Sequence, residues 1–325
     1  MAFNQQSPTL TDNILIVYNP NSGRGRGAKF AQKLGSGFLK RGIRARTFES
    51  ARVEDIYSFC KDNYGNPKCY SLAIIIGGDG TLSTCVDAML KNNFDVAVYA
   101  FGRGTANDFS TYMKTNKSIR RVIKIILASP PVRPIDTLYV RHQHYSEGSY
   151  AINVACGGAF TNGVTNYNSR AKAVFGKVAY MTKASGIAMR MRPQQVKFTV
   201  DGKELNQQEI YLFLILNTTH AGSVKYISPM ARPWDQQLNL VAIKKCGFFA
   251  KIGIMLSVLS RRAHKNKNIL QAKGKTISVE VVGDAGPNFT RTDIDGNAGD
   301  SYPLHVKVGD KRLQVVVNHT KTEGK

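Results

Sequence analysis

The chain has 325 residues, of which 42% are hydrophobic, so it is long enough for two domains with separate cores. Its 45 lysines and arginines against 22 acidic residues give a formal charge of +23, which favours an anionic partner such as nucleic acid, an acidic membrane or a phosphorylated ligand. No run of about 18 apolar residues predicts a membrane span, and the N-terminus lacks a signal-peptide pattern. Five cysteines without CxxC spacing are typical of reduced thiols in a cytoplasmic protein.

The first 136 residues alternate between short apolar runs and amphipathic stretches. We expect strands at 14–18, 44–48, 72–76 and 96–100, and helices at 28–40, 53–62, 82–89 and 117–128. The run at 72–76 is continuous, rich in β-branched residues and too short for a typical helix, which indicates a buried parallel strand. Repeated strand–helix alternation predicts a parallel sheet with helices on both faces.

Glycine-rich loops follow three of these strands: NPNSG at 19–23, GGDGT at 77–81 and GRGTAND at 102–108. Ligands of parallel sheets bind beyond the carboxyl ends of the strands, and a glycine-rich turn before a helix N-terminus suits phosphate. Asp79 lies inside the second loop, where a carboxylate would repel phosphate. It is better suited to holding a metal or meeting a substrate hydroxyl; alternatively, it only caps the next helix.

The first of these loops also carries Arg24, Arg26 and Lys29, which could face a phosphate. It does not match the GxxxxGK[ST] pattern, so no P-loop is predicted. A solvated basic turn explains these residues equally well.

After Pro134 the sequence changes to short strand-like runs. These are 150–155, 195–200, 210–217, 237–243, 276–282, 303–308 and 313–318. Turn signals such as Asp201-Gly202 punctuate them, which predicts an antiparallel sandwich or barrel. Two helical insertions interrupt the runs: 170–192 carries six basic residues and no acidic one, and 248–259 has an apolar stripe followed by Arg261, Arg262, Lys265 and Lys267.

The loops NPNSG, GGDGT and GTANDF, in this order, resemble those of the diacylglycerol kinase catalytic family, and more narrowly its soluble bacterial branch, related to sphingosine and ceramide kinases. The later segments IDTLYV, SPMARPWDQQLNLVAIK and DIDGNAGDSYPLHVKV also fit the family in order, so the resemblance covers nearly the whole chain. NAD kinases and phosphofructokinases carry loops like GGDGT, but the combination of GGDGT with GTANDF is much more specific.

The resemblance implies an α/β N-terminal domain with a parallel sheet, similar to NAD kinase and phosphofructokinase, plus a C-terminal antiparallel β-sandwich domain. We expect the nucleotide-binding domain at 12–136, with the C-terminal tail available to pack back on it, and the lipid-binding sandwich at 137–319. The reaction implied is transfer of the γ-phosphoryl group of ATP to a lipid hydroxyl, on diacylglycerol or a related lipid alcohol, with ATP and lipid meeting in the cleft between the domains. Such transfer needs phosphate-cradling N–H groups, Mg²⁺ and a carboxylate near the hydroxyl.

The resemblance also assigns roles to individual residues. The nucleotide contacts it implies are Asn19, Thr47, Gly77, Gly78, Asp79, Gly80, Thr81, Gly104 and Thr105. Asp79, Asp108 and Asp136 would form a water-bridged network that holds catalytic Mg²⁺, and Asp235 would hold a structural Mg²⁺. As alternatives, Asp108 caps the helix that begins near Phe109, and Asp136 or Asp235 pairs with a nearby arginine.

Three departures from the family pattern bear on activity. The family reads DGE late in the chain, with Glu as the general base, whereas this chain has Asp295, Gly296 and Asn297. Asn has no basic oxygen, so Asp79 serves as the base, or Asp295 or Asp300 substitutes, or the protein is weakly active or inactive. A loose transition state makes loss of a base tolerable. The other departures are Ser83-Thr84 for Asn-Glu, and Asp235-Gln236-Gln237 for Asp-Gly-Leu, which bears on the structural metal.

The basic helices fit a cytoplasmic kinase that visits the inner face of an anionic membrane, where each Lys or Arg contributes about 1 kcal/mol. The stripe at 248–259 is either an interfacial element or a face packed on the sandwich.

Members of the family often pair, so a homodimer is compatible with the sequence. Nucleic-acid binding is motivated only by charge and lacks a recognition module. The remaining rivals are an NAD-kinase-like enzyme and a non-catalytic lipid- or nucleotide-binding relative.

Overall fold

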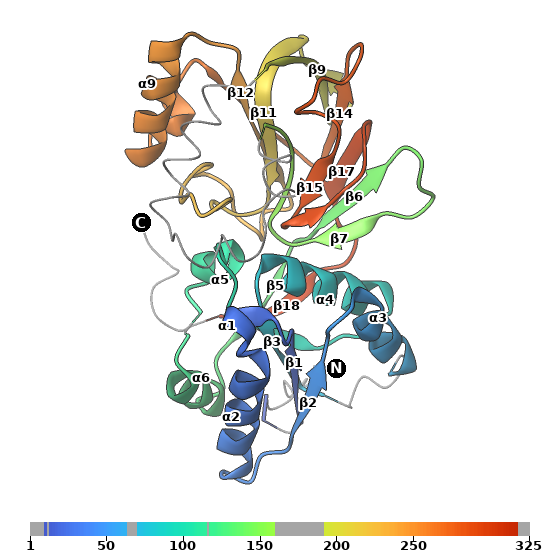
Figure 1. Ribbon diagram of the computed structural model, residues 1–325, viewed down its shortest axis with the longest axis vertical. Coiled ribbons are helices and arrows are strands. Elements are labelled where there is room, and N and C mark those ends of the chain that lie inside the picture. Colours follow the sequence, from blue (N-terminus) through green and yellow to red (C-terminus); the bar gives the residue numbers. More distant parts are fainter. Residues whose placement is uncertain (1–9, 12, 64–69, 116, 160–191, 318–325) are drawn as a thin grey trace, which may run out of the picture. The chain divides into compact units, whose positions relative to one another are not determined.

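The computed structural model describes residues 10–11, 13–63, 70–115, 117–159 and 192–317 (Figure 1). Contacts along the chain divide it into two compact units. The first unit comprises residues 1–135 and 313–325, and the second comprises residues 136–312. The chain therefore leaves the first unit once and returns to it near its C-terminus. Among the described residues, no helix is both long enough and apolar enough to cross a bilayer.

The first unit is built on a six-stranded sheet. Its strands are β1 (Ile14–Tyr18), β2 (Ala45–Glu49), β3 (Leu72–Gly77), β4 (Ala97–Gly102), β5 (Val132–Ile135) and β18 (Leu313–Val316). They lie in the order β2-β1-β3-β4-β18-β5, and all neighbours are parallel except β18 and β5. This confirms the predicted α/β class with a parallel sheet and adds one antiparallel edge strand.

Helices cover both faces of this sheet. They are α1 (Ser22–Gly25), α2 (Gly27–Leu39), α3 (Val53–Asp62), α4 (Asp79–Lys91), α5 (Asp108–Tyr112) and α6 (Ile119–Leu127). Ile14 and Ile16 of β1 share a core with Phe38 of α2 and Ile123 of α6. The residues between them, such as Leu15, are also fully buried. Because successive strand residues point to opposite faces, neither face of β1 is open to solvent.

The second unit is built on a twelve-stranded antiparallel sheet. Its strands are β6 (Leu138–His142), β7 (Ser149–Ala151), β8 (Val154–Gly158), β9 (Gln194–Val200), β10 (Lys203–Glu204), β11 (Gln208–Leu216), β12 (Leu238–Lys244), β13 (Ile269–Gly274), β14 (Thr276–Val281), β15 (Thr292–Ile294), β16 (Asn297–Ala298) and β17 (Leu304–Val308). The main path runs β16-β15-β8-β11-β9-β14-β17-β6-β7, and β12 joins β11 to β13. Phe198, Phe213 and Phe289 are fully buried in its core. The predicted antiparallel C-terminal domain is confirmed.

A second, smaller core lies under a helix of this unit. Helix α9 (Phe248–Leu259) is followed by a short 3₁₀ turn (Ala263–Lys265). Ile254 of α9 packs with Val241 of β12, Ala263 and Ile269 of β13. Figure 1 shows α9 beside β12, outside the sheet.

The structure departs from the expected strand runs in two places. The run at 150–155 is two strands, β7 and β8. The run at 313–318 forms β18 of the first unit's sheet instead of a sandwich strand. The basic insertion predicted at 170–192 lies outside the described residues apart from Arg192.

Candidate functional site

Three loops of the first unit meet beyond the carboxyl ends of β1, β3 and β4. Parallel neighbours end at the same edge of a sheet, so residues 19–25, 77–81 and 102–108 gather there. Backbone hydrogen bonds join them. The N–H of Gly23 donates to the carbonyl of Arg103 at 3.0 Å, and the N–H of Arg103 donates to the carbonyl of Gly77 at 2.6 Å. The three loops therefore form one connected surface.

The loop after β4 is held by a single asparagine side chain. Oδ1 of Asn107 accepts the N–H of Gly104 at 2.6 Å, and its Nδ2 donates to the carbonyl of Gly104 at 2.6 Å. Asn107 has φ +52°, a left-handed conformation that Asn adopts more readily than most residues. This clamp leaves Gly104 and Thr105 exposed at the tip of the loop.

Asp79 is the first residue of α4, but its carboxylate does not cap that helix. The N-cap is Gly78, which offers no side chain, and Oδ1 of Asp79 accepts the N–H of Phe109 at 3.4 Å. Burial raises the pKa of Asp79, while N–H groups of residues 107–109 and its own N–H act in the opposite direction without cancelling the rise. Asp79 is thus a half-buried carboxyl aimed at the loop after β4.

The other predicted residues of this unit surround Asp79. Asp108 begins α5, is 6% exposed, and its backbone N–H lies within reach of the Asp79 carboxylate. Thr81 follows on α4 and accepts a hydrogen bond from Nδ2 of Asn19 at 3.4 Å. The structure therefore brings Asn19, Thr81 and both carboxylates into one neighbourhood.

Basic side chains line the same loops. Arg24, Arg26 and Lys29 are exposed. The guanidinium of Arg103 is held differently, with its carbon 4.0 Å from the ring centre of Phe30 and 4.4 Å from that of Phe101. Burial lowers the pKa of Arg103, as does nearby Arg26. Sequence reasoning did not single out Arg103, although its position inside GRGTAND beside two glycines was a signal.

An open groove of about 650 Å³ runs along α2 beside the first loop. Its lining residues are Tyr18, Ala28, Lys29, Ala31, Gln32, Gly35, Ser36 and Thr47. Thr47 lies on β2 opposite Ile16 of β1 and is exposed. Thr47 therefore lies on a concave surface that begins next to the loop at residues 19–25.

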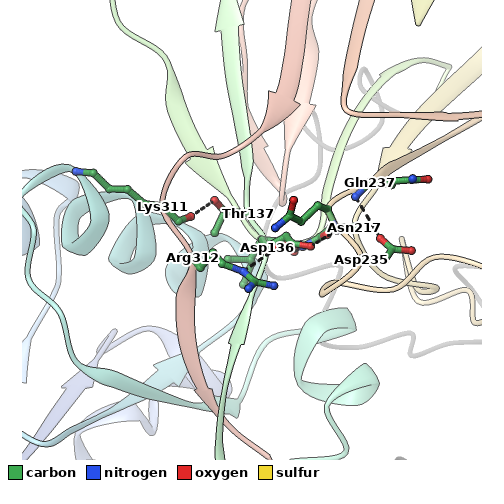
Figure 2. A network of polar contacts seen from close by, with 9 residues as sticks. Asp136, Thr137, Asn217, Asp235, Gln237, Lys311 and Arg312 are labelled. Carbon is green, nitrogen blue, oxygen red and sulfur yellow. Dashed lines mark hydrogen bonds and ion pairs between the residues drawn. The ribbon is translucent and has the colours of Figure 1, made fainter. Parts of the chain in front are cut away.

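In the second unit, Asp136 is the centre of a buried polar network (Figure 2). Its Oδ1 lies 2.9 Å from Nε of Arg312, and its Oδ2 accepts the N–H of Gln236 at 2.6 Å. Its carbonyl accepts Nδ2 of Asn217 at 2.7 Å. Asp136 is 1% exposed, so the ion pair with Arg312 compensates its buried charge. Pairing with an arginine was one of the two interpretations of the sequence.

Asp235 has a cationic partner of its own. Its Oδ2 lies 2.8 Å from Nζ of Lys273. Its Oδ1 accepts the N–H of Gln237 at 3.2 Å (Figure 2). Mg²⁺ requires near-octahedral oxygen ligands, whereas both oxygens of Asp235 already face hydrogen-bond donors. Within the described ranges, no group of three or more His, Cys, Asp or Glu side chains could hold a metal. The surroundings of Asp235 do not fit a structural Mg²⁺.

The late DG segment forms a hairpin turn between β15 and β16. Asp295 and Gly296 both have positive φ, +52° and +86°, as a two-residue hairpin turn of type I′ requires. The carboxylate of Asp295 accepts the N–H groups of Ile152 at 2.8 Å, Asn153 at 3.1 Å and Val154 at 2.7 Å. Asp295 thereby holds the chain between β7 and β8.

Asn297 and Asp300, which lie just after this turn, are both exposed. Asn297 begins β16, and Asp300 accepts a hydrogen bond from the hydroxyl of Tyr145, which raises the pKa of that tyrosine. Asp79 and Asp108 thus lie in the first unit, whereas Asp136, Asp235 and Asp295 each have separate partners in the second. The three-aspartate metal network stays a prediction.

Comparison with known families accounts for both halves of the chain. Residues 13–140 match the diacylglycerol kinase catalytic domain, and residues 154–317 match the YegS C-terminal NAD kinase beta sandwich-like domain. The chain belongs to the diacylglycerol kinase catalytic family. The resemblance drawn from the three loops is therefore confirmed.

Named relatives of this family extend over nearly the whole chain. A diacylglycerol kinase of Bacillus subtilis (strain 168) is 26% identical over 308 residues, which cover 95% of this chain and 97% of the relative. A solved diacylglycerol kinase of Bacillus anthracis str. Sterne is 18% identical with a TM-score of 0.67, covering 95% and 97% of the two chains. A solved NAD kinase of Archaeoglobus fulgidus in complex with ATP is 11% identical with a TM-score of 0.53, covering 94% of each chain. These structures show the fold.

Proposed function

We propose that this chain transfers the γ-phosphoryl group of ATP to the hydroxyl of a lipid alcohol, with diacylglycerol or a related lipid as substrate. The observation that carries the proposal is the position of Asp79. A carboxyl of raised pKa lies inside a surface made of three glycine-rich loops, where N–H groups and arginines suit phosphate. The family and the diacylglycerol kinases among the relatives support the choice of acceptor.

We place the nucleotide on the first unit. The loop that carries Gly77–Thr81, which is only partly exposed, and the exposed tip at Gly104–Thr105 would receive the phosphates. The groove along α2 that includes Thr47 would receive the rest of the nucleotide. The guanidinium of Arg103 is held against two aromatic rings, so its side chain need not reorient when phosphate binds.

Asp79 and Asp108 fit a catalytic Mg²⁺, because this ion usually takes one or two carboxylates and completes its shell with water and phosphate oxygens. When bound, it would neutralise charge on the transferring phosphoryl group. No role of this kind is proposed for Asp235.

The proposed transfer is a single displacement. The oxygen of the lipid hydroxyl forms a bond to the γ-phosphorus, the bond from that phosphorus to the β–γ bridging oxygen breaks, and ADP leaves. Asp79 orients the hydroxyl and accepts its proton, for which its raised pKa suits it. Asp295 is assigned to the turn, since three N–H groups already occupy its oxygens.

A labelled-phosphate screen tests this proposal. The chain would be incubated with γ-labelled ATP, Mg²⁺ and, in separate reactions, diacylglycerol, ceramide, sphingosine and NAD. We expect label in a lipid product, and loss of that label in Asp79→Asn. Asp95→Asn is the matched control, because Asp95 is an exposed carboxylate of the same unit that lies outside the loops. Equal labelling by wild type and Asp79→Asn would contradict the role of Asp79.

Two other outcomes would favour rival functions. Labelling of NAD alone would indicate an NAD-kinase-like enzyme. The NAD kinase of Archaeoglobus fulgidus is similar to this chain in fold, so this alternative is included in the screen. Binding of ATP with no labelled product from any acceptor would indicate a non-catalytic relative, which Asn297 in place of Glu suggests.

A further inference from the structure

Helix α9 presents an apolar face to solvent. Six of its side chains are exposed: Phe248, Phe249, Ile252, Met255, Leu256 and Leu259. The exposed fraction is 84% for Phe249, 60% for Leu259 and 57% for Leu256, values that are unusual for large apolar side chains in neighbouring positions. The sequence left open whether this stripe packs on the sandwich, and the structure places it on the outside.

The spacing of these residues makes a single surface. Positions 248, 252, 255 and 259 recur every three or four residues, and 249 and 256 lie beside them on the helix. The opposite side carries Ile254, which is 5% exposed and packs against Val241 and Ile269. One side of α9 therefore packs against the second unit, and the other side is exposed to solvent.

The charges within the segment that contains α9 have one sign, although Lys245 pairs with Glu209 of β11. Residues 244–267 contain seven lysines and arginines and no aspartate or glutamate. Arg261, Arg262, Lys265 and Lys267 follow the helix directly and are exposed. An apolar face bordered by positive charge complements a bilayer of acidic phospholipids, in which anionic headgroups lie over an apolar interior.

We propose that α9 is a membrane-binding element that inserts its apolar face into the interface of an anionic bilayer. A second copy of the chain is a poorer occupant, because two such faces would bring two sets of positive charge together. The proposal goes beyond the phosphoryl transfer proposed above, since binding to a membrane can be measured without turnover.

Sedimentation with lipid vesicles tests this surface. The full chain would be mixed with vesicles of phosphatidylcholine alone or of phosphatidylcholine with phosphatidylglycerol, and bound protein measured against salt concentration. We expect binding to the anionic vesicles that weakens as salt rises. Phe249→Ser and Leu256→Ser should each weaken it about tenfold, because each removes apolar area from the interface.

Leu39→Ser is the matched control, because Leu39 of α2 is 71% exposed and has the same chemistry in the first unit. It should bind as wild type does. Arg262→Gln with Lys265→Gln should lower binding to anionic vesicles and reduce the salt dependence. Thermal unfolding of each variant in the absence of vesicles shows that the fold is kept.

Two results would overturn the proposal. One is equal binding of anionic vesicles by wild type and Phe249→Ser. The other is a wild-type dimer in vesicle-free solution, measured by light scattering, that Phe249→Ser converts to a monomer; a second copy would then be the occupant of this face.

Discussion

A Cβ atom on Gly104 would lie 2.5 Å from Cα of Gly78, and one on Gly78 would lie 3.2 Å from Cα of Gly104. Real Cβ atoms essentially never come within 3.0 Å of such a neighbour. The loops after β3 and β4 therefore pack backbone against backbone, which only glycine allows. Their N–H groups are kept in one small region of the first unit.

Gly104→Ala is expected to separate these loops and weaken nucleotide binding. The added methyl group meets backbone, which cannot move aside as a flexible side chain could. A displacement of about 1 Å at a phosphate site costs about 10²-fold in kcat/KM. Calorimetric titration with a non-hydrolysable ATP analogue and steady-state kinetics would measure both effects.

Gly247→Ala is the control for this substitution, because nothing lies within 4 Å of a Cβ at Gly247 and its φ is an ordinary −70°. Its nucleotide affinity should equal that of wild type. If Gly104→Ala also binds as wild type does, the close packing of the loops has no part in nucleotide binding.

Asp79→Asn is expected to lose activity and gain stability together. Burial raises the pKa of Asp79 in the folded chain, so its charged form costs free energy at neutral pH, and that cost fades as pH falls and the carboxyl is protonated. The neutral amide avoids the cost. Turnover should fall about 10²-fold or more, while Tm at pH 7 should rise by about 2 °C.

Thermal unfolding at several pH values checks the sign of this effect. The gap in Tm between Asp79→Asn and wild type should narrow toward acid pH, and Asp95→Asn should show no gap. A lower Tm for Asp79→Asn at pH 7 would mean that the ionised carboxylate stabilises the fold.

The fold could be predicted to a large extent because its signals are local. The apolar run of β1 and the amphipathic stretch of α3 give the bounds 14–18 and 53–62 found in the structure. The period of hydrophobic residues acts over a few positions, so it needs no knowledge of distant partners.

The departures come from contacts between distant residues. The break between β7 and β8 is set by Asp295, which lies 143 residues after Ile152. Likewise, β18 pairs with β5 from the far end of the chain. A short apolar run does not show which sheet it joins, because strand pairing is decided by the whole fold.

The candidate site, too, could be predicted only where its signal is local. The position of Asp79 among glycines could be predicted from one loop. The ion pairs of Asp235 with Lys273 and of Asp136 with Arg312 join residues 38 and 176 positions apart, and charge alone does not select these partners from 45 basic residues.

Asn297→Glu is expected to raise turnover. Asn297 is exposed at the start of β16, so a glutamate there meets no packing constraint and supplies the basic oxygen that the family carries at this position. General base catalysis contributes about 10²-fold or more, although a loose transition state reduces the gain, and we expect about tenfold.

Asn297→Gln is the matched control, since it has the length of glutamate without a basic oxygen. Its rate should stay at the wild-type level. Equal rates for wild type, Asn297→Glu and Asn297→Gln in the labelled-phosphate assay would show that this position takes no proton.

His220 is expected to make the second unit sensitive to acid. Burial, with a smaller effect of Lys225, lowers the pKa of His220 to about 4. The unfolded chain therefore takes up a proton below about pH 6.5 that the folded chain refuses, and stability falls between pH 6.5 and 4 by on the order of 2 kcal/mol. Burial lowers the pKa of His142 as well, which adds to the loss.

Urea unfolding of wild type and His220→Asn between pH 7 and 4 would measure this loss. Asn keeps a group near Nδ1, which lies 2.6 Å from Oγ1 of Thr219, but it does not titrate. The free energy of unfolding should depend less on pH in the variant. Parallel curves for the two proteins would exclude His220 as a source of the acid sensitivity.

Lys273→Met is expected to create a dependence on divalent cations that the wild type lacks. In the wild type the Lys273 ammonium compensates Asp235 at 2.8 Å. The Mg²⁺ proposed at Asp79 and Asp108 completes its shell with phosphate oxygens, so without nucleotide the wild-type Tm should be the same in Mg²⁺ and in a chelator. The variant leaves a partly buried carboxylate without its cation and should lower Tm by about 2 °C. Millimolar Mg²⁺ or Ca²⁺ should restore part of this loss, because carboxylate oxygens are the ligands these ions prefer.

Lys245→Met provides the comparison, because Lys245 forms a similar ion pair with Glu209 at 2.9 Å on an exposed surface. Its Tm should change little, and added cations should have no effect on it. A wild type whose Tm falls on chelation in the absence of nucleotide would contradict this prediction, because a bound metal would then already contribute to stability. If the Tm of Lys273→Met does not change with Mg²⁺ or Ca²⁺, the lysine ammonium does not occupy a position where a cation could bind.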